Sequence, residues 1–202
     1  MKSNDAVSIS VGNRKLGGVM NISITPRQCC PKGIPCASNG CYAFKAYRMY
    51  PHTRKAWNKN ARIAKRDPDS YFLQIATRVT KAKPPLFRWH VAGDILNPDY
   101  LRGMCRVAEA NPETHFLAFT KAFDVGNLYE DLAVIPANLV IIFSGWPGMQ
   151  FANPHSHRIA WMQDGTETRV PDNAIECPGN CETCGLCYEL PKLGRDVVFH
   201  KH

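Results

Sequence analysis

Short runs of apolar, β-branched and aromatic residues alternate along this chain of 202 residues with longer segments whose apolar positions recur at helical spacing. The short runs predict strands at residues 21–25, 86–91, 115–119, 139–143, 158–162, 173–177 and 196–199. The longer segments predict helices at residues 42–66, with a break at Pro51, and at 68–83, 98–110 and 126–134. Strand and helix therefore alternate over most of the chain.

This order of elements is typical of parallel β/α units that are joined by right-handed crossovers. We expect residues 1–202 to form a single α/β domain, a partial or closed TIM-like β/α barrel with parallel strands. A doubly wound open sheet is the alternative. In both architectures the loops at the carboxyl ends of the strands build the functional site.

Eight of the nine cysteines lie in two short loops, one near each end of the chain. The N-terminal loop (29–41) and the C-terminal loop (177–187) carry four each: Cys29, Cys30, Cys36 and Cys41, then Cys177, Cys181, Cys184 and Cys187. Core packing does not explain cysteines that recur every few residues along loops with proline and glycine, so the pattern predicts a metal centre. Because both loops follow predicted strands, we expect them to form two walls of one site.

The spacing of the cysteines bears on the identity of the metal. Structural zinc sites usually pair two C-x2-C knuckles across a dozen or more residues, whereas the C-terminal loop compresses four thiols into C-x3-C-x2-C-x2-C. This favours an iron–sulfur cluster, of the 4Fe-4S type, with zinc as the alternative. In the N-terminal loop three thiols could hold three irons, with a C-terminal cysteine, a small molecule or Cys29 as the fourth ligand. One shared cluster and two separate clusters both agree with the spacing.

Composition bears on the compartment. The 45% hydrophobic content supports a core without cross-links, and no run approaches the roughly 18 apolar residues of a membrane-spanning helix. No N-terminal apolar stretch indicates a leader. We therefore expect a cytoplasmic protein with no membrane partner, in which the thiols stay reduced and available to a metal.

The formal net charge of +8 is local rather than general. Residues 41–66 contain eight lysines and arginines and no acidic residue, so the basic and acidic residues of the remaining chain cancel. Five aromatic residues are interleaved with these charges, which predicts a surface that grips phosphates and stacks on the bases of a nucleic acid. A solvated helix face with its aromatic side chains turned inward is the alternative.

Three polar or flexible positions follow predicted strands. Gly93 and Asp94 come after the second strand and Lys121 after the third. Asp94 could act as an acid, support a metal ligand or cap a helix, and Lys121 could reach a phosphate, a carboxylate or a cluster sulfide. They are the candidate catalytic residues. Within the second strand, alternation directs Arg88 and His90 to the same side of the sheet.

Five segments resemble, in order, the bacteriophage gene product 88 family: CPKGIPCASNGCYAFKAYRMYPHTRKAWNKN, FRWHVAGDI, FLAFTKA, SGWPG and CPGNCETCGLCY. The resemblance covers roughly residues 20–190. It implies a phage-encoded iron–sulfur protein in the host cytoplasm, with Cys30, Cys36, Cys41, Cys177, Cys181, Cys184 and Cys187 as the metal ligands. Cys29 lies outside the family pattern, and Tyr188 stands where a tryptophan is common.

The chain is also distantly similar to radical S-adenosylmethionine enzymes. These enzymes place a three-cysteine loop after the first strand of a partial β/α barrel, and a Gly-Gly-Glu-Pro motif after the second. The segment 90–94 stands where that motif would be, which implies that Gly93, Asp94 and Lys121 bind a cofactor, S-adenosylmethionine among the options. The spacing departs from the family, because the N-terminal loop has x5 and x4 rather than x3 and x2.

Two function classes follow. The first is an iron–sulfur protein on a radical-SAM-like barrel with a redox or radical-type role and an unidentified redox partner. The second is a nucleic-acid-binding or regulatory module in which an iron–sulfur cluster or zinc is structural. The chain contains no Walker-type phosphate loop, Rossmann fingerprint, nucleophile elbow or zinc-protease helix, so the sequence offers no support for those enzyme classes.

Overall fold

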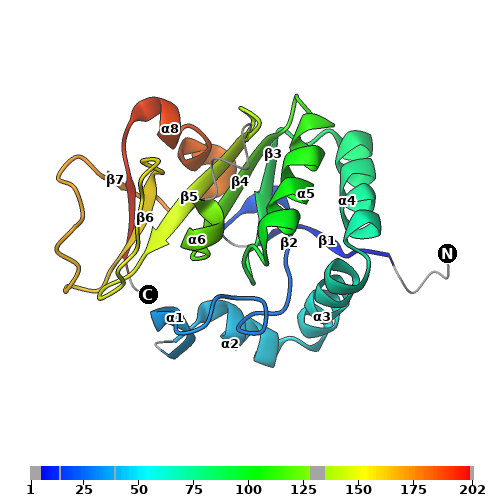
Figure 1. The fold of residues 1–202 in the computed structure, drawn as a ribbon, viewed down its shortest axis with the longest axis horizontal. Coiled ribbons are helices and arrows are strands. Elements are labelled where there is room, and N and C mark those ends of the chain that lie inside the picture. Colours follow the sequence, from blue (N-terminus) through cyan, green and yellow to red (C-terminus); the bar gives the residue numbers. More distant parts are fainter. Residues whose placement is uncertain (1–5, 14, 39, 128–134, 201–202) are drawn as a thin grey trace.

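A single eight-stranded sheet forms the centre of the protein in the computed structural model, which describes residues 6–13, 15–38, 40–127 and 135–200 (Figure 1). The strand order is β1-β2-β3-β4-β5-β6-β8-β7, and every pairing is parallel except the β1–β2 hairpin. The strands are β1 (Ile9–Asn13), β2 (Gly17–Ile22), β3 (Leu86–Trp89), β4 (His115–Thr120), β5 (Leu139–Gly145), β6 (Ile159–Gln163), β7 (Ile175–Glu176) and β8 (Val197–His200).

The sheet is open, so the closed form of the expected barrel is wrong and its partial form is not confirmed. Strands β1 and β7 are its two edges, and among the described residues they do not pair with each other. The parallel α/β class is confirmed, and every predicted strand overlaps an observed one. Strand β1 was not predicted, because its short sequence ISVGN has little apolar pattern and gains its place by pairing with β2. That pairing also places β2 earlier in the chain than predicted.

The helices that begin at Tyr42, Pro51, Pro68 and Pro98 start where the sequence signals predict, whereas those that begin at Pro35, Phe123, Cys181 and Leu190 were not predicted there. They are α1 (Pro35–Ser38), α2 (Tyr42–Met49), α3 (Pro51–Arg66), α4 (Pro68–Ala82), α5 (Pro98–Glu109), α6 (Phe123–Gly126), α7 (Cys181–Cys184) and α8 (Leu190–Leu193). Asp67 and Asn97 cap α4 and α5 by accepting hydrogen bonds from Ser70 N and Tyr100 N. Of the predicted helix 126–134, residues 128–134 lie outside the described residues.

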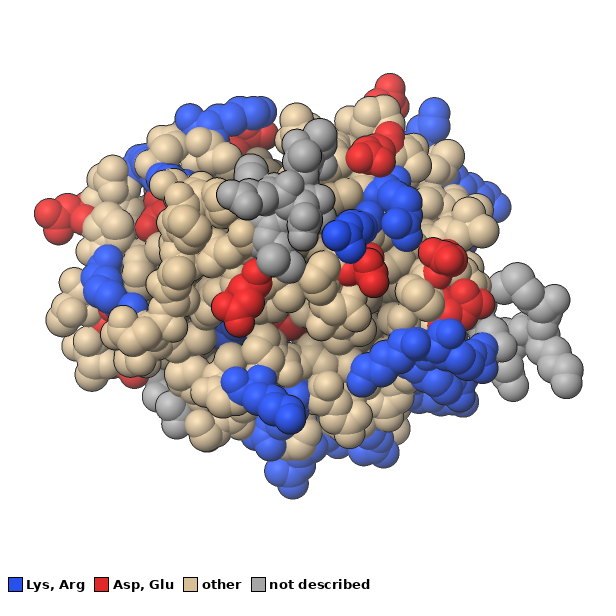
Figure 2. Space-filling model, viewed as in Figure 1, with Lys and Arg blue, Asp and Glu red and all other residues tan. Residues whose placement is uncertain are grey.

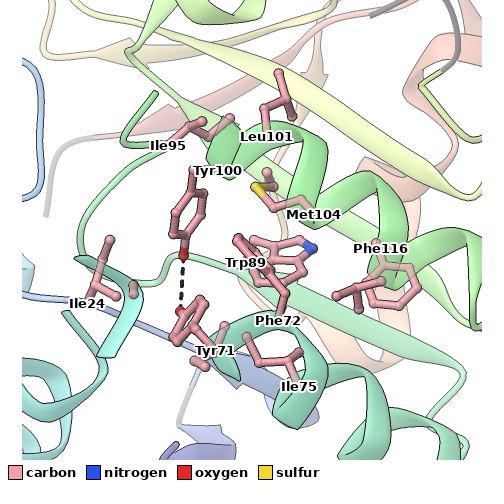
Figure 3. Close-up of a cluster of buried hydrophobic side chains, with 14 of the residues drawn as sticks. Ile24, Tyr71, Phe72, Ile75, Trp89, Ile95, Tyr100, Leu101, Met104 and Phe116 are labelled. Carbon is pink, nitrogen blue, oxygen red and sulfur yellow. Dashed lines mark hydrogen bonds between the residues drawn. The ribbon is translucent and has the colours of Figure 1, made fainter. Parts of the chain in front are cut away.

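Two hydrophobic layers cover the two faces of the sheet. On one face, buried side chains of α3, α4 and α5 pack against β2 to β5, and the aromatic centre of this core is seen in Figure 3. On the other face, Tyr188 and Leu190 of the C-terminal segment pack against β4, β5 and β6. The C-terminal cysteine loop therefore lies across this second face of the sheet. No described helix is both long and apolar enough to cross a membrane.

A tight junction joins the ends of β2 and β3. The His90 amide donates to the Ile22 carbonyl at 2.9 Å, and the Ile24 amide donates to the Ala92 carbonyl at 3.0 Å. Gly93 has a φ of +83°, and a Cβ atom at this position would lie 2.3 Å from Ile24 Cγ1. Glycine is therefore required here by backbone conformation and by close approach. This junction places the N-terminal cysteine loop beside the end of β3.

Candidate functional site: two cysteine centres

The N-terminal cysteine loop leaves β2 and returns at the start of α2. Its base is held by the Cys29 amide, which donates to the Thr25 carbonyl at 3.0 Å. Its far side is held by Arg27, whose guanidinium donates to the Ala37 carbonyl at 2.7 Å and lies 3.7 Å from the Phe44 ring centroid. The loop is thus fastened both to the sheet and to α2.

Three thiols of this loop influence one another electrostatically. Burial, together with the charges of Asp94, Cys36 and Cys41, raises the pKa of Cys30 to about 12. Burial also raises the pKa of Cys36, partly offset by the Lys121 ammonium. Cys30, Cys36 and Cys41 therefore lie close enough to interact with one another and with the two strand-end residues. At neutral pH the Cys30 thiol is protonated, and a metal bound there would displace that proton.

The Asp94 side chain links the segment after β3 to the end of β4 through hydrogen bonds. Its side chain is buried, and Oδ1 accepts hydrogen bonds from Thr120 Oγ1 at 2.6 Å and from the Ile95 amide at 2.7 Å. Oδ2 accepts from the Lys121 amide at 2.8 Å. Burial raises the pKa of Asp94 and these donors oppose the rise. The sequence offered Asp94 as a candidate helix cap, but Asn97 caps α5 instead.

Lys121 connects β4 with β5. Its Nζ donates to Ser144 Oγ at 2.9 Å and lies 5.5 Å from the Trp146 ring centroid. The side chain also faces a cleft of about 840 Å³ that opens beside Cys30. The cleft is bounded by the N-terminal cysteine loop, α3 and the segments that follow β3, β4 and β5. This is the carboxyl edge of the sheet, where sites of parallel α/β proteins form.

The C-terminal cysteines surround a pocket of their own. All four of them line a small pocket of about 20 Å³, together with Ile175, Leu186, Leu190 and Val197. The Cys177 amide donates to the Val198 carbonyl at 3.0 Å, and the Cys181 amide donates to the Lys15 carbonyl at 3.0 Å. Gly185 ends α7 in a left-handed conformation, with a φ of +61°, which turns the chain toward Cys187. The loop thus spans from the β7 edge to the β1–β2 hairpin.

Arg88 supplies positive charge to this second centre. Burial raises the pKa of Cys187 to about 12, and the Arg88 charge opposes the rise. Burial likewise raises the pKa of Cys181, opposed by Arg88 and Lys15. The Arg88 guanidinium lies 4.0 Å from the Phe119 ring centroid, and its Nε donates to the Trp89 carbonyl at 3.1 Å. Neither Arg88 nor Lys15 was singled out as a partner of the cysteines from the sequence.

From the sequence we expected both cysteine sets to lie around Asp94 and Lys121. The charges in the structure divide differently. Those two residues act on the N-terminal set, whereas Arg88 and Lys15 act on the C-terminal set. Thiols of both sets act on Tyr42, whose hydroxyl donates to the Val91 carbonyl at 2.8 Å. Burial raises the pKa of this hydroxyl, the Arg88 charge lowers it, and thiols of both sets raise it further.

A single metal ion and a cluster require different spacings between the thiols that hold them. Four thiolates around one zinc ion lie about 3.8 Å apart, given a Zn–S bond of about 2.3 Å. Among the described residues, no group of three or more Cys, His, Asp or Glu side chains is placed to hold one metal ion. A 4Fe-4S cluster attaches each cysteine to a different iron and spreads the sulfurs more widely. All four C-terminal thiols line one largely apolar pocket of about 20 Å³.

His90 lies in the core rather than beside Arg88. Because β3 ends at Trp89 and His90 has a φ of +53°, the alternation of the strand does not continue, and the predicted common side is wrong. Its Nε2 lies 3.0 Å from the Tyr100 hydroxyl, which lies 3.0 Å from the Tyr71 hydroxyl; the Tyr71–Tyr100 contact is drawn in Figure 3. Burial lowers the pKa of His90 to about 3, so its imidazole is neutral at pH 7.

The basic segment forms α2 and α3 and lies along the lower edge of the molecule in Figures 1 and 2. Its aromatic residues divide between rings that pack against one another and rings that stay exposed. Phe44, Tyr47 and Trp57 stack in sequence, with ring centroids 6.0 and 6.5 Å apart. Tyr42 and Tyr50 remain 67% and 55% exposed among the charges.

Comparison with known proteins tests the resemblances. The chain matches no curated protein and no solved structure. These comparisons bring out no similarity to radical S-adenosylmethionine enzymes. The sequence model of one family, described as gene product 88, matches residues 1–190 and thereby includes both cysteine loops. The chain belongs to the gene product 88 family.

Proposed function

We propose that this protein is an iron–sulfur protein that binds two 4Fe-4S clusters, one at each cysteine set. The observation that carries the proposal is the pocket that all four C-terminal cysteines line together. No cysteine of the N-terminal loop is among the described residues that line it. Conversely, the large cleft is bordered by Cys29 and Cys30 and by no described C-terminal cysteine. Two separate surroundings support two clusters rather than one shared cluster.

The C-terminal centre has the character of an electron-transfer site. A bound 4Fe-4S cluster supplies one-electron redox chemistry. Arg88 and Lys15 would offset the negative charge of four thiolates, and Leu190 and Val197 would exclude water from the sulfurs. The positive charges raise the reduction potential of a cluster, whereas the exclusion of water lowers it, because the reduced cluster carries more negative charge.

The N-terminal centre has the character of a reactive site. Cys30, Cys36 and Cys41 would supply three ligands, and the adjoining cleft leaves room for a small molecule at the fourth iron, S-adenosylmethionine being one option. Lys121 would stay anchored through Ser144 while its charge acts on Cys36. Asp94 would keep the ends of β3 and β4 in place beneath the cysteine loop.

Metal analysis tests this function. Protein purified without oxygen is expected to be brown and to contain about eight irons and about eight acid-labile sulfides per chain. After reduction it is expected to show the electron paramagnetic resonance signal of two reduced 4Fe-4S clusters. A colourless protein that contains stoichiometric zinc and no labile sulfide would contradict the proposal.

A second function, contact with single-stranded nucleic acid through α2, is supported by the exposed face of that helix. Tyr42, Lys45 and Met49 recur at helical spacing, and all three are exposed. Arg48 adds a second exposed charge on the same helix. Lysine and arginine bind phosphates without regard to sequence, and an exposed aromatic ring offers a stacking platform for a base.

Charge reversal tests the nucleic-acid contact. Lys45→Glu with Arg48→Glu is expected to weaken binding to a single-stranded oligonucleotide by about tenfold or more and to flatten its salt dependence, because phosphate contacts are lost. Fluorescence anisotropy at several salt concentrations measures both effects. Arg78→Glu with Lys81→Glu is the matched control, since these exposed residues have the same spacing on α4. Equal losses in the two double variants would rule out a specific surface on α2.

A further inference from the structure

The cleft beside Cys30 has the size and position of a small-molecule site. Its volume of about 840 Å³ lies in the range of ligand pockets, and it opens at the carboxyl ends of β3, β4 and β5. Several separate segments of the chain build its walls, so the shape is set by the packing of the domain rather than by one loop. What the cleft accepts follows from the side chains on its two sides.

Three lysines line the cleft. Lys32 comes from the N-terminal cysteine loop, Lys65 from the last turn of α3 and Lys121 from the end of β4. Asp124 is the one acidic residue among the described residues that line the cleft. The lining of the cleft therefore carries an excess of positive charge, and its three lysines come from three different parts of the chain.

The lysines keep donors for a ligand. Each ammonium carries three N–H groups, and Lys121 donates one of them to Ser144 Oγ. Lys65 lies beside the buried Cys29 thiol, where its charge lowers the pKa that burial raises. A neutral thiol accepts hydrogen bonds weakly, so most of the donor capacity of Lys65 remains for an anion. Lys32 is exposed at the mouth of the cleft.

Another part of the cleft is apolar and aromatic. Phe123 and Phe151 both line it, and their rings stack with centroids 4.2 Å apart and an interplanar angle of 15°. Phe143 supports both rings from the sheet, at centroid distances of 5.1 and 6.0 Å. Ile95 and Val125 extend the apolar surface. A rigid aromatic surface of this kind favours a flat ring as its partner.

We propose that the cleft binds an organic phosphate, with the phosphate toward the lysines and a planar ring against the phenylalanine pair. Lysine acts as a point charge that suits phosphate, whereas bidentate recognition of a carboxylate favours arginine, and no described arginine lines the cleft. The cleft adjoins the proposed N-terminal centre, but nucleotide binding is measured separately from metal content, so the two proposals can fail independently.

Binding of a nucleotide and its two fragments tests the assignment. Adenosine monophosphate, adenosine and inorganic phosphate serve as probes in anaerobic isothermal titration calorimetry of the full-length protein as purified. Adenosine monophosphate is expected to bind at least about tenfold more tightly than either fragment, because only it engages both sides of the cleft. Binding no tighter than that of inorganic phosphate or of adenosine would overturn the proposal.

Two variants and one control locate the site. Lys65→Gln is expected to raise the dissociation constant of adenosine monophosphate about tenfold through loss of a charge-assisted hydrogen bond. Lys55→Gln, an equally exposed change on the same helix outside the cleft, should leave it within about twofold. Phe151→Leu should weaken adenosine monophosphate more than inorganic phosphate, with folding checked by circular dichroism. If Lys65→Gln and Lys55→Gln behave alike, the nucleotide binds elsewhere and the proposal fails.

Discussion

Cys187→Ser is expected to remove about four of about eight irons per chain and to leave the other four in place. Cys187 lies in the apolar pocket that the four C-terminal cysteines share, and the oxygen of serine is a poor ligand for iron in such surroundings. Cys36→Ser is expected to remove the other four, and the double variant all eight. Iron and labile-sulfide analysis, with electron paramagnetic resonance of each reduced variant, measures the result.

Cys105→Ser is the control for these changes. Cys105 is buried in α5 among the residues of the first hydrophobic core, apart from both cysteine loops. Its replacement should leave the iron content unchanged, although it introduces a hydroxyl into the core. If either single variant at Cys187 or Cys36 lost all of its iron, the two loops would share one cluster, and the assignment of two centres would be wrong.

Gly93→Ala is expected to lower the free energy of unfolding by about 3 kcal/mol, the sum of a strained backbone and an overpacked contact. The added methyl group would require Ile24 to move, because Cγ1 lies 2.3 Å from the new Cβ position. The residue must also keep a φ of +83°, which an L-amino acid with a side chain rarely adopts. Urea denaturation of the wild-type and variant proteins measures the difference.

Gly33→Ala separates the two contributions. Gly33 has a φ of +73°, and a Cβ atom there would have no heavy atom within 4 Å. Only the conformational cost remains, so a loss of about 1 kcal/mol is expected. Equal losses at the two positions would show that the contact with Ile24 contributes nothing, and the junction between β2 and β3 would be looser than the structure indicates.

Local signals were sufficient for most of the secondary structure. Pro51 separates α2 from α3, and the Asp67-Pro68 and Asn97-Pro98 pairs begin α4 and α5, as their capping chemistry predicts. Strand β1 lacked such a signal, because its residues are only partly buried and its stability comes from pairing with β2. Closure of the sheet could not be decided either, since it depends on the twist and stagger of all the strands.

Some residues of the candidate site were recognisable from the sequence, and others were not. The cysteine spacing made both loops recognisable as metal-binding candidates without a structure, because ligands of one centre lie close together in the sequence. The partners of those cysteines were not recognisable. Arg88 reaches the C-terminal loop from β3, and Lys65 reaches the cleft from α3. Such contacts join residues that are far apart in the chain, so no local pattern marks them.

The amino-acid sequence was sufficient to establish the α/β class, most strand and helix positions, and the two cysteine loops as the feature to explain. The tertiary structure alone shows that the sheet stays open and that the C-terminal loop crosses its second face to reach Lys15. It also assigns Asp94 and Lys121 to one set of thiols and Arg88 to the other. The reason is physical. Propensity and ligand spacing act over a few residues, whereas strand order, burial and charge pairing depend on which distant segments pack together.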